Sequence, residues 1–306
     1  MIEDKANLYD FKDDIVLNNV PDNHVMINDK IKQRKICKKY FEDNVNLWDV
    51  YYEGNGNPYK YNLDKVKAIL KKCGGKTLLD IGCGSGKTLC DFIKMGFESD
   101  GCDFATNAVM ETRKKMNRLG INDNVYLIDI EDEYLKKKYD VIVSIGVFPH
   151  ITDDRNALSN VVKMLNRNGT VIIQFRNELF NLFTFNSYSK TTFKKLIPFN
   201  LLSDKLKNDF DVFINQKFSS GSINSEFKIL SKFDNPLNID GLFKSVGLEI
   251  KNIYFFHYHV LPPIFQLNNN DEFLTMSEKL EKSNDWRGYF LASSFIVEAK
   301  PINPKK

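Results

Sequence analysis

A glycine-rich turn between a short apolar segment and a short amphipathic segment constrains this fold more than any other feature. Residues 77–81 are strand-like, glycines follow at 82, 84 and 86, and residues 87–95 have helical spacing of apolar side chains. Glycines lack a Cβ and let the backbone pass close beneath a ligand, while the helix offers unpaired N–H groups and the positive end of its dipole. The pattern predicts a strand–turn–helix unit of a nucleotide-type binding site.

Three ligand classes use such a turn, and the residues distinguish them. A dinucleotide fingerprint requires glycine where Lys87 stands, and a P-loop that ends in Gly86-Lys87-Thr88 requires glycine where Ile81 stands. Residues 78–86, Leu-Leu-Asp-Ile-Gly-Cys-Gly-Ser-Gly, instead resemble motif I of the class I S-adenosylmethionine-dependent methyltransferases, with Asp80 at the acidic position. This resemblance implies S-adenosylmethionine as the cofactor.

Two acidic residues follow the next predicted strands. Asp103 ends a strand over 98–102, where a carboxylate can accept hydrogen bonds from ribose hydroxyls, although the same acid would suit NAD. Asp129 follows a strand over 124–128, and the resemblance implies that it binds the adenine amino group while Ile130 packs on the ring. Asp129 could instead be the second acid of a P-loop protein.

The next segments match the order and spacing of the same family. A strand over 139–144 leads to Ile-Gly-Val-Phe-Pro-His-Ile at 145–151, which is similar to motif IV of the small-molecule branch. A helix over 157–165 and a fifth strand over 169–175 follow. The resemblance places these residues at the cofactor: Asp80, Gly82, Cys83, Gly84, Gly86, Asp103, Phe104, Asp129, Ile130, Ser144 and Gly146.

The resemblance implies an α/β fold, a Rossmann-like, doubly wound, seven-stranded sheet with an antiparallel last strand. Residues 1–62 are predicted to form an N-terminal helical and aromatic cap, and residues 63–306 the methyltransferase domain. Within that domain we predict a lid over 184–235, inserted after the fifth strand, that covers the acceptor and excludes water. Further helices are predicted over 28–40, 62–73 and 239–246, and further strands over 248–256 and 289–300.

Methyl transfer from a sulfonium needs alignment and a dry site more than covalent machinery. A sugar hydroxyl, however, would need a base, and His150 at the end of the fourth strand is the first candidate, with Glu178 and His257 as alternates. His150 could instead cap the turn that follows the strand. For an ionised acceptor or a neutral amine, the histidine would only position the substrate.

The candidate acceptor contacts lie mostly after the fifth strand. Arg176 could bind a phosphate or carboxylate with two donors, or form a salt bridge to Glu178 or to the lid. The stretch Arg-Asn-Glu-Leu-Phe at 176–180 is similar to stretches in methyltransferases of bacterial surface-sugar and natural-product pathways. The predicted substrate-binding residues are Tyr51, Tyr52, Arg176, Asn177, Tyr188 and His259, and the two tyrosines could equally pack the cap onto the body. We predict no metal site, because the two histidines at 257 and 259 have no evident third ligand.

Composition favours an ordinary globular enzyme. The chain has 306 residues, a net charge of only +3, and five cysteines without paired C-x-x-C spacing, which predicts reduced thiols in the cytoplasm. The sequence shows neither an export signal nor an apolar run of about 18 residues, so we predict no membrane partner. DNA methylation is disfavoured because residues 144–148 lack the Asn/Asp-Pro-Pro-aromatic pattern, and no nucleic-acid partner is predicted.

The sequence therefore predicts methyl transfer to an oxygen of a small polar metabolite, such as a sugar, a sugar phosphate or a nucleotide-linked sugar. Methylation of a small amine is the alternative within the family. A P-loop nucleotide hydrolase or kinase is the alternative of another class. The sequence predicts no particular oligomeric state.

Overall fold

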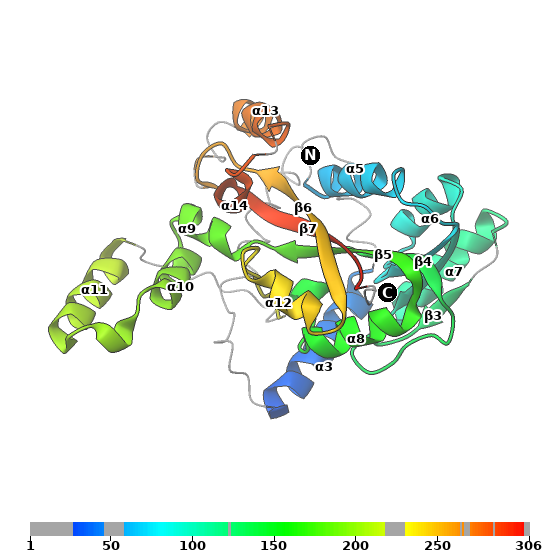
Figure 1. The fold of residues 1–306 in the computed structure, drawn as a ribbon, viewed down its shortest axis with the longest axis horizontal. Coiled ribbons are helices and arrows are strands. Elements are labelled where there is room, and N and C mark those ends of the chain that lie inside the picture. Colours follow the sequence, from blue (N-terminus) through cyan, green and yellow to red (C-terminus); the bar gives the residue numbers. More distant parts are fainter. Residues whose placement is uncertain are drawn as a thin grey trace.

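A twisted seven-stranded sheet forms the centre of the protein (Figure 1). The computed structural model describes residues 27–45, 58–121, 124–217, 230–263, 265, 270–283 and 285–302. The strand order is β3-β2-β1-β4-β5-β7-β6, in which β7 runs antiparallel to both of its neighbours. The strands are β1 (Thr77–Ile81), β2 (Glu98–Asp103), β3 (Val125–Leu127), β4 (Tyr139–Ser144), β5 (Leu165–Arg176), β6 (Leu248–Tyr258) and β7 (Ala292–Pro301). The predicted α/β class and the antiparallel last strand are confirmed.

Helices cover both faces of the sheet (Figure 1). The longer ones are α3 (Ile27–Asp43), α5 (Pro58–Leu70), α6 (Lys87–Lys94), α7 (Thr106–Arg118), α8 (Asp154–Met164), α10 (Ser187–Leu196), α11 (Asp204–Lys217) and α13 (Asn270–Glu281). The shorter ones are η2 (Phe148–His150), η3 (Glu178–Phe180), α9 (Asn181–Thr184), η4 (Phe199–Leu201), α12 (Ile239–Lys244) and α14 (Gly288–Leu291).

The apolar runs of the central strands follow from this two-sided cover. Successive side chains of a strand point to opposite faces, so Leu78 packs with α5 and α6 whereas Leu79 packs with α8 and α12. Phe175 of β5 lies in the second of these two cores, with its ring 5.5 Å from that of Phe295 on β7. The two cores hold the carboxyl ends of the parallel strands at one edge of the sheet.

Several boundaries differ from the predictions. Helix α8 begins at Asp154 because the side chain of Asp153 accepts a hydrogen bond from the backbone N–H of Asn156. Strand β5 begins at Leu165, which pairs with Tyr139 before an irregularity in the register.

The last strands also begin or end away from their predicted limits. The strand predicted from residue 289 begins at Ala292, because residues 288–291 form α14. Strand β6 was predicted to end at residue 256 but continues through Tyr258, so His257 lies within the strand, with a φ of +56°.

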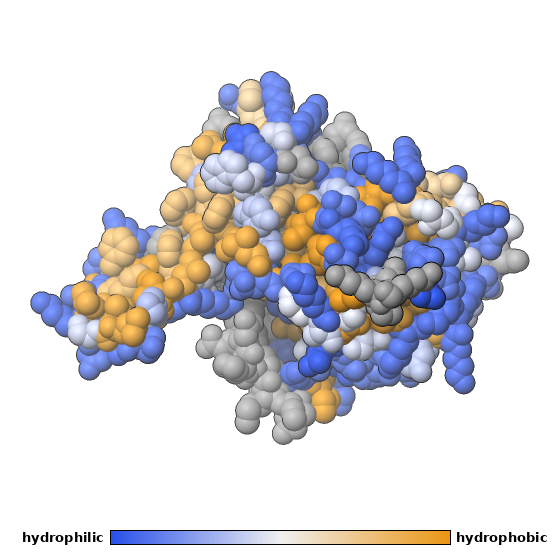
Figure 2. Space-filling view, in the orientation of Figure 1, coloured by the Kyte–Doolittle hydropathy of each residue, from blue (hydrophilic) through white to orange (hydrophobic). Residues whose placement is uncertain are grey.

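The segment predicted as a lid is helical over most of its described part. Helices α10 and α11 form an arm that projects from the body (Figure 1). The chain returns to the sheet at Asp234, which bridges to Asn177 beside the end of β5. The arm exposes the apolar side chains of Leu196, Leu201, Leu206, Val212 and Phe213. Hydrophobic residues, in orange, gather at the end of the arm (Figure 2). That this segment covers an acceptor stays a prediction.

Two further sequence expectations can be compared with the described residues. None of the helices in the described part of the chain is long and apolar enough to cross a bilayer. The five cysteines all lie in described segments, and none of them forms a disulfide.

Candidate active site

The glycine turn after β1 has the close-packed geometry that its sequence predicts. Gly82 has a φ of +76°, and a Cβ there would lie 2.1 Å from Cγ2 of Val147, so only glycine fits. Gly84 has a φ of +52°, and a Cβ there would meet no atom of the described residues within 4 Å. One side of the turn is therefore packed against the β4 loop, and the backbone of Gly84 faces open space.

Asp103 lies beside this open backbone. Its carboxylate accepts hydrogen bonds from the N–H of Gly84 at 3.0 Å and from the N–H of Ala105 at 2.9 Å. Burial raises the pKa of Asp103 to about 6, although these backbone donors favour the ionised form. Each carboxylate oxygen retains a lone pair that can accept a hydroxyl hydrogen. The position suits the predicted recognition of ribose.

The side chains of Asp80 and Cys83, at the glycine turn, are both buried. Asp80 is buried and accepts a hydrogen bond from the hydroxyl of Thr88 at 2.7 Å, and burial raises its pKa to about 7. The Cys83 side chain lies in an apolar cluster with Leu89, where burial raises the pKa of the thiol. We therefore expect Cys83 to contact a cofactor through its backbone only.

Asp129 and Ile130, the predicted adenine contacts, follow β3. Asp129 is half-buried, and its Oδ1 accepts a hydrogen bond from the N–H of Glu131 at 3.1 Å. Its Oδ2 lies 2.5 Å from Nη2 of Arg34 on α3. Ile130 is buried in the main core with Leu79, so the predicted packing of its side chain on an adenine ring finds no support in this structure.

A buried polar cluster lies where β4 and β5 end. The amide oxygen of Gln174 accepts hydrogen bonds from Nδ2 of Asn62 at 2.7 Å and from the N–H of Gly146 at 3.0 Å. The Asn62 Oδ1 and the Ser144 hydroxyl are buried and have no partner among the described residues. An unpaired buried polar group costs about 1–3 kcal/mol, so this cluster fits a ligand with polar ends of its own. The amino and carboxylate groups of S-adenosylmethionine meet that requirement.

His150 follows β4 on the short helix η2. Its Nδ1 donates a hydrogen bond to the carbonyl oxygen of Leu230 at 2.5 Å, and its ring packs edge-on against Phe41 at 5.1 Å. A carbonyl can only accept, so the bond places the proton on Nδ1 and leaves Nε2 as the basic nitrogen. Burial, together with the charges of Arg176 and Lys232, lowers the pKa of His150 to about 4 despite the Leu230 bond. The imidazole is thus neutral near pH 7.

The predicted acceptor residues after β5 are largely engaged by the protein itself. Arg176 donates a hydrogen bond to the Ser231 hydroxyl at 2.8 Å and lies over the Phe233 ring. Glu178 pairs with Lys195 of α10, so the alternative pairing of Arg176 with Glu178 is not observed.

The side chain of Asn177 forms its hydrogen bonds within the protein. It is fully buried, and its Nδ2 lies within hydrogen-bonding distance of three carbonyl oxygens in residues 288–292. Its Oδ1 accepts from the N–H of Leu179. The amide group of Asn177 is therefore already engaged by the protein, and its binding to a substrate stays a prediction.

The remaining described candidates lie on β6, directly after β6, and on α10. Nδ1 of His257 lies 2.6 Å from the Ser293 hydroxyl, and the centroids of the His257 and His259 rings are 4.5 Å apart. His259 is buried, neither ring nitrogen has a partner within the described part of the chain, and burial lowers its pKa well below the usual range. Tyr188 is buried on α10. Tyr51 and Tyr52 lie outside the described residues.

No metal centre was predicted, and the described residues contain no group of three or more His, Cys, Asp or Glu side chains that could hold a metal ion.

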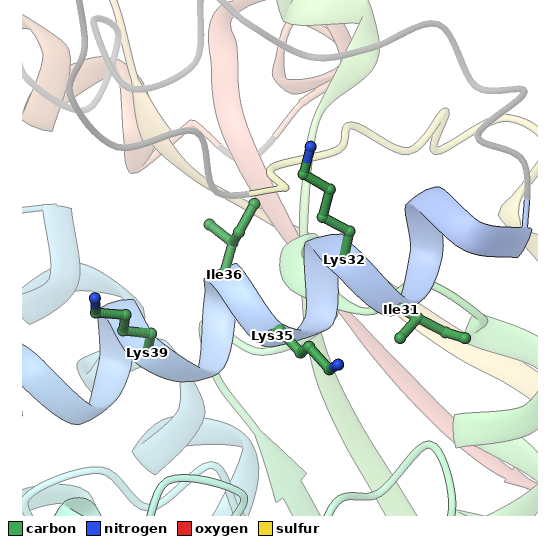
Figure 3. Close-up of a pocket in the computed structure, with 5 residues that line it drawn as sticks. All are labelled: Ile31, Lys32, Lys35, Ile36 and Lys39. Carbon is green, nitrogen blue, oxygen red and sulfur yellow. The ribbon is translucent and has the colours of Figure 1, made fainter.

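A hollow of about 440 Å³ runs along α3, lined by Ile31, Lys32, Lys35, Ile36 and Lys39 (Figure 3). The hollow contains none of the residues predicted at the cofactor, so it is distinct from the glycine turn.

The sequence reasoning missed the residues that other elements bring to this edge. They are Arg34, Phe41 and Glu42 of α3, Asn62 of α5 and Gln174 of β5. Arg34 contacts a residue 95 positions away and Asn62 one 112 positions away, so no local pattern signals them.

Comparison with known proteins identifies the domain. Residues 79–171, which run from the middle of β1 into β5, match the family described as "Methyltransferase domain". These residues form a methyltransferase domain, and the P-loop alternative is set aside.

Relatives of this methyltransferase match most of its length. Protein 235L of Invertebrate iridescent virus 6, named as a methyltransferase, is 25% identical over 80% of this chain and 89% of its own. A ubiquinone biosynthesis O-methyltransferase of Rickettsia prowazekii is 20% identical over 81% of this chain and 91% of its own.

Solved structures share the fold. A magnesium protoporphyrin IX methyltransferase from Synechocystis, crystallised with bound SAH, has a TM-score of 0.52 and 15% identity over 87% of this chain and 98% of its own. A 1,6-didemethyltoxoflavin-N1-methyltransferase from Burkholderia thailandensis has a TM-score of 0.54 and 10% identity over 90% and 91%.

The raised pKa of Asp103 leads to a pH-dependent prediction. S-adenosylhomocysteine should bind the ionised carboxylate, so its Kd at pH 5 should be about tenfold higher than at pH 8. The ligand-free fold should respond in the opposite direction. The folded pKa of about 6 exceeds the ordinary value of about 3.9, so Asp103 destabilises the ligand-free fold as the pH rises between them. Calorimetric titration and thermal melting across this range would test both trends, and Asp103→Asn should abolish the pH dependence of binding.

Proposed function

We propose that this methyltransferase transfers a methyl group to an oxygen of a small polar metabolite. The observation that carries the proposal is the histidine after β4. The Leu230 carbonyl fixes the proton of His150 on Nδ1, so Nε2 is available as a base at the edge where β1 and β4 lie side by side. An alcohol must lose a proton as it attacks, and a base at this position meets that need.

Each part of the site has a role in the proposed reaction. S-adenosylmethionine supplies the electrophilic methyl group when bound. The open side of Gly84 and the carboxylate of Asp103 hold the nucleoside, and Asp129 holds the adenine. The cluster of Asn62 and Ser144 binds the polar methionine end. His150 accepts the hydroxyl proton at Nε2, with Glu178 and His257 as alternate bases, and the surrounding side chains exclude water.

A sugar, a sugar phosphate or a nucleotide-linked sugar is the proposed acceptor. Of the two cations near His150, Lys232 pairs with Asp154, whereas Arg176 has no carboxylate partner among the described residues, which favours an acceptor that carries a phosphate or a carboxylate. The name of the Rickettsia relative, an O-methyltransferase, supports oxygen as the methylated atom. A small amine is the alternative, and it would not require His150 as a base.

The test has a binding step and a transfer step. Calorimetric titration should show micromolar binding of S-adenosylhomocysteine and none of ATP with magnesium. Methyl transfer from labelled S-adenosylmethionine should then appear with nucleotide sugars or sugar phosphates and be absent with small amines. Transfer to amines alone would contradict the oxygen assignment, and transfer to simple phenols alone would contradict the sugar class.

A further inference from the structure

Helix α3 lies across the carboxyl ends of three strands. Its side chains contact the segments that follow β2, β3 and β4, which are the segments that carry the proposed cofactor residues. These contacts join residues 64 to 109 positions apart in the sequence. Tertiary contacts therefore hold the helix over the segments that follow β2, β3 and β4, rather than contacts with its neighbours in the chain.

The middle of α3 is held beside Asp129, the predicted adenine contact. Nη2 of Arg34 lies 2.5 Å from Oδ2 of Asp129 and 2.5 Å from Oδ2 of Asp132, and Nε lies 3.8 Å from Glu131. Hydrogen bonding to Asp132, followed by Asp129, raises the pKa of the guanidinium despite partial burial. One cation thus links α3 to three carboxylates after β3.

The C-terminal end of α3 is held beside the segment that follows Asp103, the predicted ribose contact. Glu42 accepts hydrogen bonds from the backbone N–H of Thr106 at 2.8 Å and of Asn107 at 2.9 Å, at the start of α7. Burial opposes its ionisation, yet these N–H donors leave its pKa lowered. Helix α7 has no side-chain cap of its own at Ala105, so α3 provides the anionic cap.

Apolar contacts lie between the polar contacts of Arg34 and those of Glu42. Phe41 packs on Phe104 at 6.0 Å and on His150 at 5.1 Å, and buried Cys37 packs with Leu230. Arg34 and Glu42 are eight residues apart, which corresponds to about 12 Å along a helix. The polar contacts of Arg34 and Glu42, together with the aromatic contacts of Phe41, thus reach the segments that follow β2, β3 and β4.

We propose that Arg34 and Glu42 are positioning residues that retain the cofactor, because they hold α3 over the segments that carry Asp103 and Asp129, and these contacts must break before the cofactor leaves. The inference rests on the proposed function, since it takes Asp103 and Asp129 as cofactor ligands. Arg34 acts through Asp129, which it orients, and Glu42 acts through the start of α7, which follows Asp103 by three residues. Neither residue is assigned a part in proton transfer.

The dissociation rate of the cofactor is the decisive quantity. Tritiated S-adenosylmethionine bound to the enzyme without acceptor is chased with excess S-adenosylhomocysteine. Arg34→Ala and Glu42→Ala should each release the label about tenfold faster, because each loses charge-assisted hydrogen bonds. Arg34→Lys and Glu42→Gln retain part of each contact and should give smaller increases. Lys35→Ala removes an exposed cation of the same helix and should leave the rate unchanged.

The outcomes separate this inference from the proposed function. If the unaltered enzyme fails to bind the cofactor, the proposed function is wrong. If it binds and both alanine variants, shown by thermal melting to be folded, release the label at the unaltered rate, only the retention role is wrong. Slower release from Arg34→Ala would also overturn that role, because it would mean that Arg34 competes with the cofactor for Asp129.

Discussion

Asp103→Ala is expected to weaken S-adenosylhomocysteine binding by at least about 100-fold. The carboxylate is predicted to accept hydrogen bonds from both ribose hydroxyls, and hydrogen bonds to a charged group contribute about 1.5–3 kcal/mol each. The substitution also removes the acceptor that orders the N–H of Gly84, which adds to the loss. Calorimetric titration at pH 8, where the carboxylate is ionised, measures the effect.

A second acid of β2 provides a matched control. Asp100 is also buried, but its carboxylate accepts hydrogen bonds from the Tyr139 hydroxyl at 2.6 Å and from Lys137 at 2.7 Å, away from the turn. Asp100→Asn should lower the melting temperature and leave the Kd of the folded protein nearly unchanged. Equal losses of affinity in the two variants would sink the ribose assignment of Asp103.

His150→Ala is expected to lower kcat by about 10²–10⁴-fold, the range in which general bases contribute. The Kd of S-adenosylhomocysteine should change by less than about threefold, since His150 is assigned to the acceptor rather than the cofactor. Rapid-quench turnover with a saturating acceptor, together with titration of the cofactor, separates the two quantities.

The glutamine variant distinguishes a base from a structural cap. His150→Gln retains a donor for the Leu230 carbonyl but has no nitrogen that accepts a proton. If His150 is the base, glutamine should be nearly as inactive as alanine. Recovery of most of the activity by glutamine would show that the hydrogen bond to Leu230, and not proton transfer, is the contribution of this residue.

Local patterns predicted the part of the site that lies in one stretch of chain. The turn from β1 to α6 was predicted because strand, glycines and helix are adjacent in the sequence and their conformations follow from those residues. The order of the strands followed from the resemblance. By contrast, the ion pair between Arg34 and Asp129 depends on where the whole N-terminal helix docks, which local propensity does not encode.

The interpretation of individual side chains was less certain for the same reason. Asn177 follows a parallel strand, where ligands often bind, but α14 packs against it and takes up its amide group. Residues 289–291 of α14 were predicted as strand because their alternation continues from β7. Only tertiary packing decides whether Asn177 binds a ligand or the protein, and whether residues 289–291 form a strand or a helix. The sequence therefore predicts where the site lies in the sheet better than it predicts the role of each residue there.

The place of β7 in the sheet has a consequence for synthesis on the ribosome. β7 is the last described strand along the chain, yet it lies between β5 and β6 and pairs with both. β6 therefore has no partner within the described sheet until β7 has left the exit tunnel. Until then, apolar side chains such as Phe255 and Phe295 lack the neighbours that later bury them. The nascent chain can order β1 to β4 early, but β5 to β7 can complete their pairing only after β7 has been synthesised. We therefore expect a chaperone to bind this second half of the nascent chain.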